Sequence, residues 1–361
     1  MKPLSKATAT KIEKLISVSR EIIHECALEN GAIVAANSTK KRYPVHAKNY
    51  FYVWPRDAAF TCMAADILGV DSIQENFFSW CLDRAEGFSR NGIFYEKYYP
   101  NGLKALWNFQ PDQTGSVLVA LWHHYKNKKR RSSKFHDLVD IAANGICNVW
   151  EQSHFTVVIN DLWEERFCFP DLDENFSYSL AACVGGLECA NEFLPTKRWI
   201  KTATAMRNRL DEHYMDFFAR SFGKIPDRRI DASMMGLVYP FQVYAADDPR
   251  MVATIGEIEK KLAINGGIHR YEHDEYDGWM YETTHRKKGA GAWPLLNFWL
   301  SIYYSVKGDP ERARNYYTWV LKRTGDHIPE QIFENDIQVS VSPLLWSHAM
   351  FILASSHLGL I

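Results

Sequence analysis

Residues 161–167, DLWEERF, place three carboxylates around one tryptophan. Two carboxyl groups in different environments can perform acid/base chemistry without a metal, because one keeps a proton to donate while the other stays ionised and activates water. The same stretch could also be a solvated entrance to a helix, with no chemical role. The choice between these interpretations depends on whether distant polar motifs converge on this stretch.

Metal and nucleophile chemistry have weak support in the sequence. His269 and His273 are four residues apart, but Arg-Tyr-Glu lies between them and no HExxH motif occurs. His123 and His124 fit a helix surface. There is no EF-hand array of carboxylates and no GxSxG turn around a serine. We therefore predict a site with no metal and no cofactor.

Composition narrows the classes of partner. The formal net charge of the 361 residues is −1, so no overall field attracts the chain to nucleic acid or to a membrane. No stretch approaches the roughly 18 apolar residues of a membrane span, and the first residues lack the apolar core of a secretory signal. Seven cysteines without a CxxC pair suit reduced thiols. We expect a cytoplasmic protein that acts on small molecules, with oligomer formation left open.

Apolar residues recur at helical spacing along almost the whole chain. The apolar face of the first helix contains Ile12, Leu15, Ile22 and Cys26, and Gly31 can end this helix. Eleven more helices are predicted near residues 57–69, 71–88, 112–127, 133–152, 177–192, 195–220, 231–239, 250–263, 291–306, 310–323 and 343–358. Strand signals are sparse: residues 92–102 could form a short hairpin and residues 154–160 a short extended piece.

Twelve helices of similar length suit either a helical solenoid or a closed double ring of six inner and six outer helices. The second, fourth, tenth and twelfth helices are strongly apolar, whereas the ninth and eleventh are amphipathic, and this alternation favours the double ring. Every polar and aromatic motif precedes an even-numbered helix, so in a double ring the motifs would meet at one mouth. This convergence favours a catalytic interpretation of residues 161–167 within an all-α fold.

Four motifs resemble glycoside hydrolase family 15, the glucoamylase family. They occur in the family's order and span nearly the whole chain. The resemblance implies an (α/α)6 barrel, in agreement with the helix count. The motifs are Trp54-Pro-Arg-Asp57, Asp161-Leu-Trp-Glu-Glu165, Arg270-Tyr271 followed by Asp274 and Tyr276, and Pro329-Glu-Gln331, which residues 344–349 extend.

The resemblance also implies a role for each matching residue. Glu164 would be the general acid and Glu330 the general base of an inverting hydrolysis, and Tyr50 would help to hold the attacking water. We expect burial against Trp163, with the charges of Asp161 and Glu165, to raise the pKa of Glu164 so that it keeps its proton. The residues implied to bind sugar are Trp54, Arg56, Asp57, Asp161, Trp163, Glu165 and Arg270, with Trp107 matching in looser surroundings.

The implied activity is that of an exo-acting, inverting α-glucosidase that releases β-glucose from the non-reducing ends of short α-glucosides. Maltose-type 1,4 links are the first expectation and isomaltose-type 1,6 links the second. We expect residues 1–361 to form one catalytic domain, without the N-terminal β-sandwich or the starch-binding module of some family members. Residues 277–292 lengthen one loop and could cover outer subsites. Two alternatives stay open: a trehalase of the same family and a non-catalytic, sugar-sensing regulatory barrel.

Overall fold

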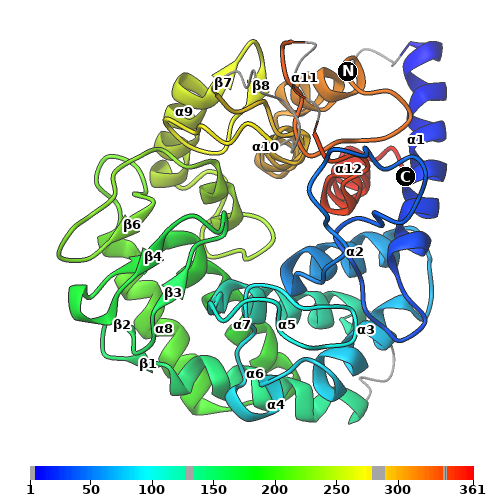
Figure 1. Ribbon diagram of the computed structural model, residues 1–361. Helices are drawn as coiled ribbons and strands as arrows, with labels where there is room; N and C mark the ends of the chain where they lie inside the picture. Colours follow the sequence, from blue (N-terminus) through cyan, green and yellow to red (C-terminus); the bar gives the residue numbers. More distant parts are fainter. Residues whose placement is uncertain (1–4, 127, 129–132, 279–288, 336–337, 339) are drawn as a thin grey trace.

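The computed structural model describes residues 5–126, 128, 133–278, 289–335, 338 and 340–361. Helices dominate this part of the chain (Figure 1). The α-helices are α1 (Lys6–Cys26), α2 (Pro55–Ile67), α3 (Ile73–Asp83), α4 (Phe88–Asn91), α5 (Pro111–Tyr125), α6 (His136–Asn148), α7 (Ser177–Phe193), α8 (Lys197–Glu212), α9 (Pro249–Leu262), α10 (Pro294–Lys307), α11 (Pro310–Leu321) and α12 (Leu345–His357). The 3₁₀ helices are η1 (Ser133–Phe135), η2 (Pro170–Leu172) and η3 (Ala232–Leu237).

The strands of the described residues are two residues long and form four antiparallel pairs. Their shortness makes them connectors between helices rather than a layer of the fold. The pairs are β1 (Trp150–Glu151) with β2 (His154–Phe155), β3 (Ile159–Asn160) with β4 (Phe167–Cys168), β5 (Asn175–Phe176) with β6 (Ser221–Phe222), and β7 (Ala263–Ile264) with β8 (Gly267–Ile268).

Six helical elements pack side by side in a ring. Helix α2 contacts α5, α5 contacts α7, α7 contacts η3, η3 contacts α10, α10 contacts α12, and α12 returns to α2. Figure 1 shows the five α-helices of this series around a common centre. Nearly every residue of α2, α5 and α12 is buried, which is why these helices are apolar on all sides.

The other long helices pack on the outside of this ring. Helix α8 buries Trp199, Ala203, Met206 and Leu210, which follow one another at steps of three and four along one face. It lies on α7, while α1 lies on α12, α3 on α2, α9 on η3 and α11 on α10. The predicted alternation of apolar and amphipathic helices therefore matches the positions of these helices in the fold.

Proline sets the start of three ring helices. Pro55, Pro111 and Pro294 each occupy the first turn, where a missing N–H costs nothing and the fixed φ suits a helix. The residue before a proline is extended, as Trp54 and Trp293 are. The chain therefore turns sharply at these points, and both indoles lie at helix N-termini.

Several predicted elements differ from those observed. The helix predicted at 231–239 is only the 3₁₀ helix η3, whose N-terminal Asp231 accepts from Ser233 N at 2.8 Å and which Pro240 follows soon afterwards. The helix predicted at 71–88 ends at Asp83, and Gly87 at φ 86° separates it from α4. The helices predicted at 133–152 and 195–220 end at Asn148 and Glu212 respectively.

The strand predictions had mixed outcomes. Residues 92–102 form no regular hairpin; instead Tyr98 pairs with Val53 and Lys104 in single bridges. The extended piece predicted at 154–160 is confirmed, since it contains β2 and β3. Among the described residues, no helix combines the length and the apolar character that crossing a bilayer requires.

Close contact between two ring helices gives a stability prediction. A Cβ on Gly115 of α5 would lie 2.1 Å from the backbone oxygen of Ala182 on α7, so Gly115→Ala must push the helices apart. We expect a loss of at least about 2 kcal/mol in the free energy of unfolding. Gly256→Ala on α9 is the matched control, because nothing lies within 4 Å of its Cβ, and helix propensity predicts a gain of about 1 kcal/mol. Denaturant unfolding of both variants measures the difference, and equal effects would contradict the proposed close packing.

Candidate active site

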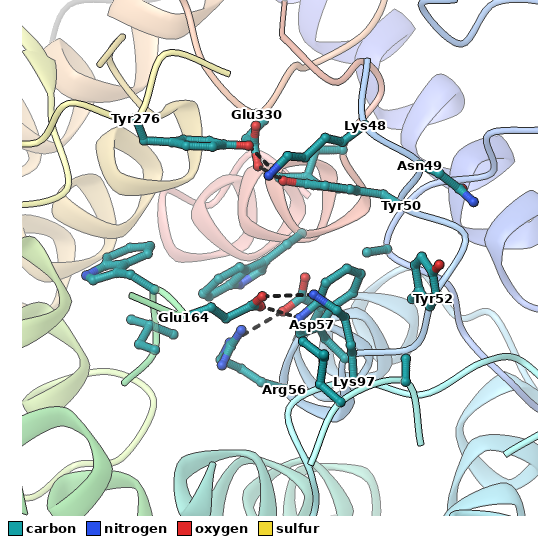
Figure 2. A pocket seen from close by; sticks show the side chains of 18 of the residues that line it. Lys48, Asn49, Tyr50, Tyr52, Arg56, Asp57, Lys97, Glu164, Tyr276 and Glu330 are labelled. Carbon is teal, nitrogen blue, oxygen red and sulfur yellow. Dashed lines mark hydrogen bonds and ion pairs between the residues drawn. The ribbon is translucent and has the colours of Figure 1, made fainter. Parts of the chain in front are cut away.

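A cavity of about 660 Å³ lies beside the N-terminal ends of α2, α10 and α12 and contains most of the predicted site. Its wall is built by segments that are far apart in the sequence (Figure 2). This volume is within the usual range of small-molecule sites. The predicted residues that line it are Tyr50, Trp54, Arg56, Asp57, Trp163, Glu164, Glu165, Arg270 and Glu330.

Glu164 lies in the tight loop that joins β3 to β4. The Asp161 carboxylate closes the loop by accepting hydrogen bonds from Glu165 N at 2.9 Å and Arg166 N at 3.2 Å. Glu164 itself has φ 63°, a left-handed conformation that is uncommon for a residue with a side chain and that persists where the surroundings enforce it. The stretch is thus a hairpin loop, not a helix entrance.

The surroundings of Glu164 favour its protonated form. Its side chain is 26% exposed, because it faces the cavity. Burial is the main reason that its pKa is raised to about 8; Lys97, whose Nζ lies 3.3 Å from Oε2, opposes the rise, and the charge of Glu96 adds to it. The indole N–H of Trp54 donates to Oε1.

The predicted cause of this pKa rise was partly wrong. Burial was correct, but the tryptophan that donates to Glu164 is Trp54, and the carboxylate that raises its pKa is Glu96 rather than Asp161 or Glu165. The indole of Trp163 donates instead to Asp231, at 3.1 Å to Oδ2. Alternate residues of a tight loop point in different directions, so neighbours in sequence need not share surroundings.

Glu330 lies on the wall opposite Glu164 (Figure 2). Its side chain is buried, and Oε1 accepts a hydrogen bond from the Tyr50 hydroxyl at 2.7 Å. The other oxygen, Oε2, has no hydrogen-bond partner among the described residues. Burial raises the pKa of Glu330 to about 7, while the Tyr50 hydrogen bond and the charges of Arg270 and Lys48 limit the rise.

Arg56 and Asp57 form a buried polar floor at the start of α2. Arg56 Nη1 contacts Asp112 Oδ2 at 3.1 Å and Gln110 Oε1 at 3.2 Å, and its Nε lies 3.4 Å from Asp57 Oδ1. Burial raises the pKa of Asp57 to about 6, and the nearby charge of Arg56 opposes the rise. Asp57 Oδ1 and Arg56 Nε are buried against each other, while both residues line the cavity.

Arg270 links two loops of the cavity wall. Its guanidinium donates to both oxygens of Asp274 at 2.7 Å, and to Glu165 Oε1 at 2.6 Å. The rings of Trp163, Tyr271, Tyr276 and Trp293 surround it at 5.0–5.4 Å. Paired charges and cation–π contacts together hold this buried cation.

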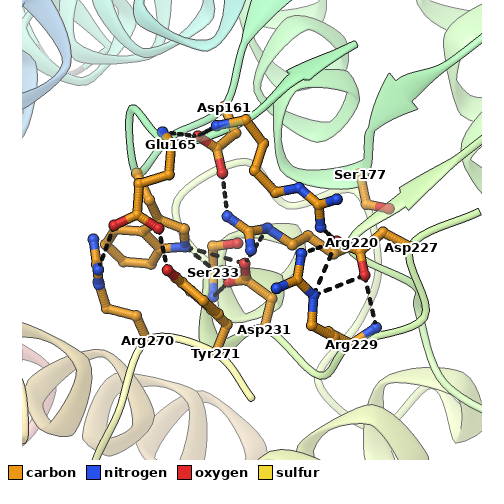
Figure 3. Close-up of polar contacts among 12 residues, drawn as sticks. Asp161, Glu165, Ser177, Arg220, Asp227, Arg229, Asp231, Ser233, Arg270 and Tyr271 are labelled. Atoms are coloured by element: carbon orange, nitrogen blue, oxygen red, sulfur yellow. Dashed lines mark hydrogen bonds and ion pairs between the residues drawn. The ribbon is translucent and has the colours of Figure 1, made fainter. Parts of the chain in front are cut away.

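The structure does not bring Asp161 and Trp107 to the wall formed by the described residues. Asp161 is 2% exposed and forms an ion pair with Arg220, which in turn lies 3.2 Å from Asp231 Oδ2 (Figure 3). Asp161 supports the loop between β3 and β4 from the side away from the cavity. Trp107 is 73% exposed and packs against Lys104, whose Nζ lies 3.4 Å from the ring centroid.

Sequence reasoning missed several lining residues. Lys97 and Tyr99 flank the bridge at Tyr98, in a segment that was predicted only as a possible hairpin. Tyr52 lies two residues before Trp54 and could have been found from the alternation of an extended chain. Lys48 carries no recognisable motif. Trp346 lies in LLWSHA, and its ring lies 5.2 Å from the Arg56 guanidinium.

Comparison with known proteins agrees with this geometry. The sequence description of glycosyl hydrolases family 15 matches residues 15–356. The chain belongs to this family. The predicted resemblance is therefore confirmed over nearly the whole sequence.

Individual relatives are similar to this chain at low sequence identity. An uncharacterised glycosyl hydrolase of Methanocaldococcus jannaschii is 31% identical over 90% of this chain, and the chain spans only 52% of that relative. The isomaltose glucohydrolase of Kribbella flavida is 22% identical, with 94% of each chain covered. A solved glycosidase variant in complex with glucose superposes with a TM-score of 0.81 at 21% identity, covering 99% of this chain and all of the other. This last likeness shows a shared fold.

The donor set of the family 15 site is not that of a metal centre. Among the described residues, no three or more His, Cys, Asp or Glu side chains form a group that could hold a metal ion. Each carboxylate of the cavity instead forms an ion pair with an arginine or a lysine, or accepts a hydrogen bond from a tyrosine or a tryptophan.

Burial of Glu330 predicts a pH-dependent penalty on stability. Its folded pKa of about 7 exceeds the ordinary glutamate pKa of 4.5. Below the unfolded pKa the group is protonated in both states; as pH rises towards the folded pKa, only the unfolded state loses the proton, so stability falls. Glu330→Gln stays neutral, and we expect it to be more stable than wild type at pH 8 by on the order of 1–3 kcal/mol.

Denaturant unfolding at pH 4 and pH 8 measures this effect. At pH 4 the difference between Glu330→Gln and wild type should vanish. Glu257→Gln, on the outer helix α9, removes a partly exposed carboxylate and should show no such dependence. Equal stability of wild type and Glu330→Gln at pH 8 would contradict the raised pKa.

Proposed function

We propose that the protein is an inverting, exo-acting α-glucosidase that releases β-glucose from the non-reducing ends of short α-glucosides. The ring of helices, closed by contact of α12 with α2, is interpreted as the inner layer of an (α/α)6 barrel whose mouth carries the site. The observation that carries the proposal is the placement of Glu164 and Glu330 on opposite walls of one cavity, beside Arg56 and Asp57.

Glu164 acts as the general acid. Its raised pKa keeps the carboxyl protonated near neutral pH, as proton donation to the glycosidic oxygen requires. The Trp54 indole donates to Oε1, so Oε2 is the oxygen that carries the proton to be donated. Donation leaves Glu164 ionised, and Lys97 stabilises that charge at 3.3 Å.

Glu330 acts as the general base. The Tyr50 hydroxyl, which lines the same cavity, positions the carboxylate through Oε1, and the carboxylate takes a proton from the attacking water. The water attacks the face of the sugar opposite the leaving group, so the product has inverted configuration. Tyr276, whose hydroxyl lies 3.2 Å from that of Tyr50, extends this hydrogen-bonded chain.

Glucose binds between these two walls. Arg56 and Asp57 are suited to adjacent hydroxyls, because charge-assisted hydrogen bonds are short and directional. Glu165 and Arg270 form the neighbouring edge of the subsite, and Trp54 and Trp163 offer flat apolar faces to the ring. We assign Asp161 to support of the loop between β3 and β4, and Trp107 to an outer surface. Both differ from the sugar contacts that the resemblance implied.

Isomaltose-type 1,6 links rank first among the substrates, ahead of maltose-type 1,4 links. The isomaltose glucohydrolase of Kribbella flavida is the relative that matches over 94% of both chains. Trehalose is the third candidate, because a trehalase of Mycobacterium tuberculosis matches over 79% of this chain at 23% identity.

Assays of isomaltose, maltotriose and trehalose side by side test the reaction. We expect glucose release, fastest from isomaltose, with β-glucose as the first anomer seen by NMR. α-Glucose as first product would refute inversion. Glucose binding without hydrolysis of any of the three would favour the sugar-sensing alternative.

Three amide variants test the assignment of roles. Glu164→Gln and Glu330→Gln should each lower kcat by about 10²–10⁴-fold, because each removes a proton-transferring group. Glu165→Gln should mainly raise KM, since Glu165 binds Arg270 and the Tyr271 hydroxyl rather than facing Glu330. Full activity of Glu330→Gln, or an inactive Glu165→Gln beside an active Glu164→Gln, would show that the roles are misassigned.

A further inference from the structure

A second buried carboxylate, Glu96, lies behind Glu164. It is 2% exposed and belongs to the segment between α4 and α5. Its Oε2 accepts hydrogen bonds from Asn160 Nδ2 at 2.7 Å and from Asn108 Nδ2 at 3.0 Å. Its Oε1 lies 3.1 Å from Lys97 Nζ. Three donors thus hold Glu96 in its ionised form, and its pKa is lowered despite its burial.

Lys97 joins the two carboxyl groups. Its Nζ lies 3.1 Å from Glu96 Oε1 and 3.3 Å from Glu164 Oε2, and 5.0 Å from the centroid of the Trp54 ring. One ammonium therefore bridges a carboxylate and a carboxylic acid.

We propose that Glu96 is a positioning residue for the general acid: its ionised carboxylate, linked to Glu164 through the Lys97 ammonium, keeps Glu164 protonated until substrate binds. This inference rests on the proposed role of Glu164. Two carboxyl groups on one ammonium hold one proton between them, because both cannot be ionised at such short range without a large repulsion. The arrangement prevents loss of the Glu164 proton to water before substrate binds.

The other charged groups around Glu164 do not provide this function. Arg56, below it on α2, has the opposite effect, because a cation favours the ionised carboxyl. Glu165, next in sequence, is held by Arg270 and the Tyr271 hydroxyl. Tyr276, across the cavity, is a neutral phenol with a raised pKa. Glu96 is the negative charge that contributes most to the raised pKa of Glu164.

Two substitutions should move the alkaline limb of kcat/KM in opposite directions, because this limb reports the pKa of the acid in the free enzyme. Glu96→Gln removes the neighbouring negative charge, so the pKa of Glu164 falls and the limb moves to lower pH by about 1 unit or more. Lys97→Met removes the positive charge, so the limb moves to higher pH. The acidic limb, which reports Glu330, should stay in place in both variants.

Opposite shifts with unchanged acidic limbs support the proposal. An alkaline limb that stays fixed in both, or moves the same way in both, overturns it, whatever the change in kcat, since a purely structural role predicts lower activity without a shifted limb. Glu257→Gln is the charge-matched control on α9 and should leave the profile unchanged. Lys97 is 21% exposed in its side chain, so Lys97→Met gives a result even if Glu96→Gln fails to fold.

A second measurement separates this inference from the proposed function. With ¹³C-labelled glutamate carboxyls, the Glu164 signal is identified by its loss in Glu164→Gln, and its titration is followed in wild type, Glu96→Gln and Lys97→Met. Opposite pKa shifts confirm the contact even if no substrate is hydrolysed. An unshifted Glu164 titration refutes it even if the enzyme is active.

Discussion

The buried guanidinium of Arg270 is the interaction on which the geometry of the cavity depends. It binds Glu165 on the loop between β3 and β4, and Asp274 on the loop after β8, while four aromatic rings enclose it. A buried cation is costly unless its donors are satisfied, so the two loops cannot separate without exposing an unpaired charge. Because Glu164 precedes Glu165, the Arg270 interaction also fixes the position of Glu164.

The carboxyl groups in and behind the cavity have different surroundings. Asp161, behind the wall, is bound by Arg220 and by two backbone N–H groups and supports the loop between β3 and β4. Glu330 and Glu164 have raised pKa values because both are withdrawn from water, and their remaining partners decide how far each rises. Strain is present as well, since Glu164 occupies a left-handed backbone conformation. Burial of these carboxyl groups and the left-handed backbone both cost free energy of folding. The packing of the helix ring must offset that cost.

The helix pattern and the motif order were accessible from sequence because both depend on local rules. Helical spacing of apolar residues predicted nearly all long helices, and the prolines at 55, 111 and 294 mark where ring helices begin. The predicted helix at 231–239 was wrong in type, because six residues before a proline are too few to build stable α-helical turns. Segment ends near Gly87, Asn148 and Glu212 were also missed, since caps and short strand pairs there compete with weak helix propensity.

The sequence by itself determined the family, the helical class and the two carboxyl groups expected to act, since these follow from periodicity and from motifs read along the chain. Only the tertiary structure decided which residues surround them. Trp54, Glu96 and Lys97 meet Glu164 from segments about 70 to 110 positions away, and Asp161 turns away from the cavity although it lies three residues from Glu164. The reason is that a pKa and a binding contact depend on distance in space and on burial, and loop folding sets both independently of the order of residues.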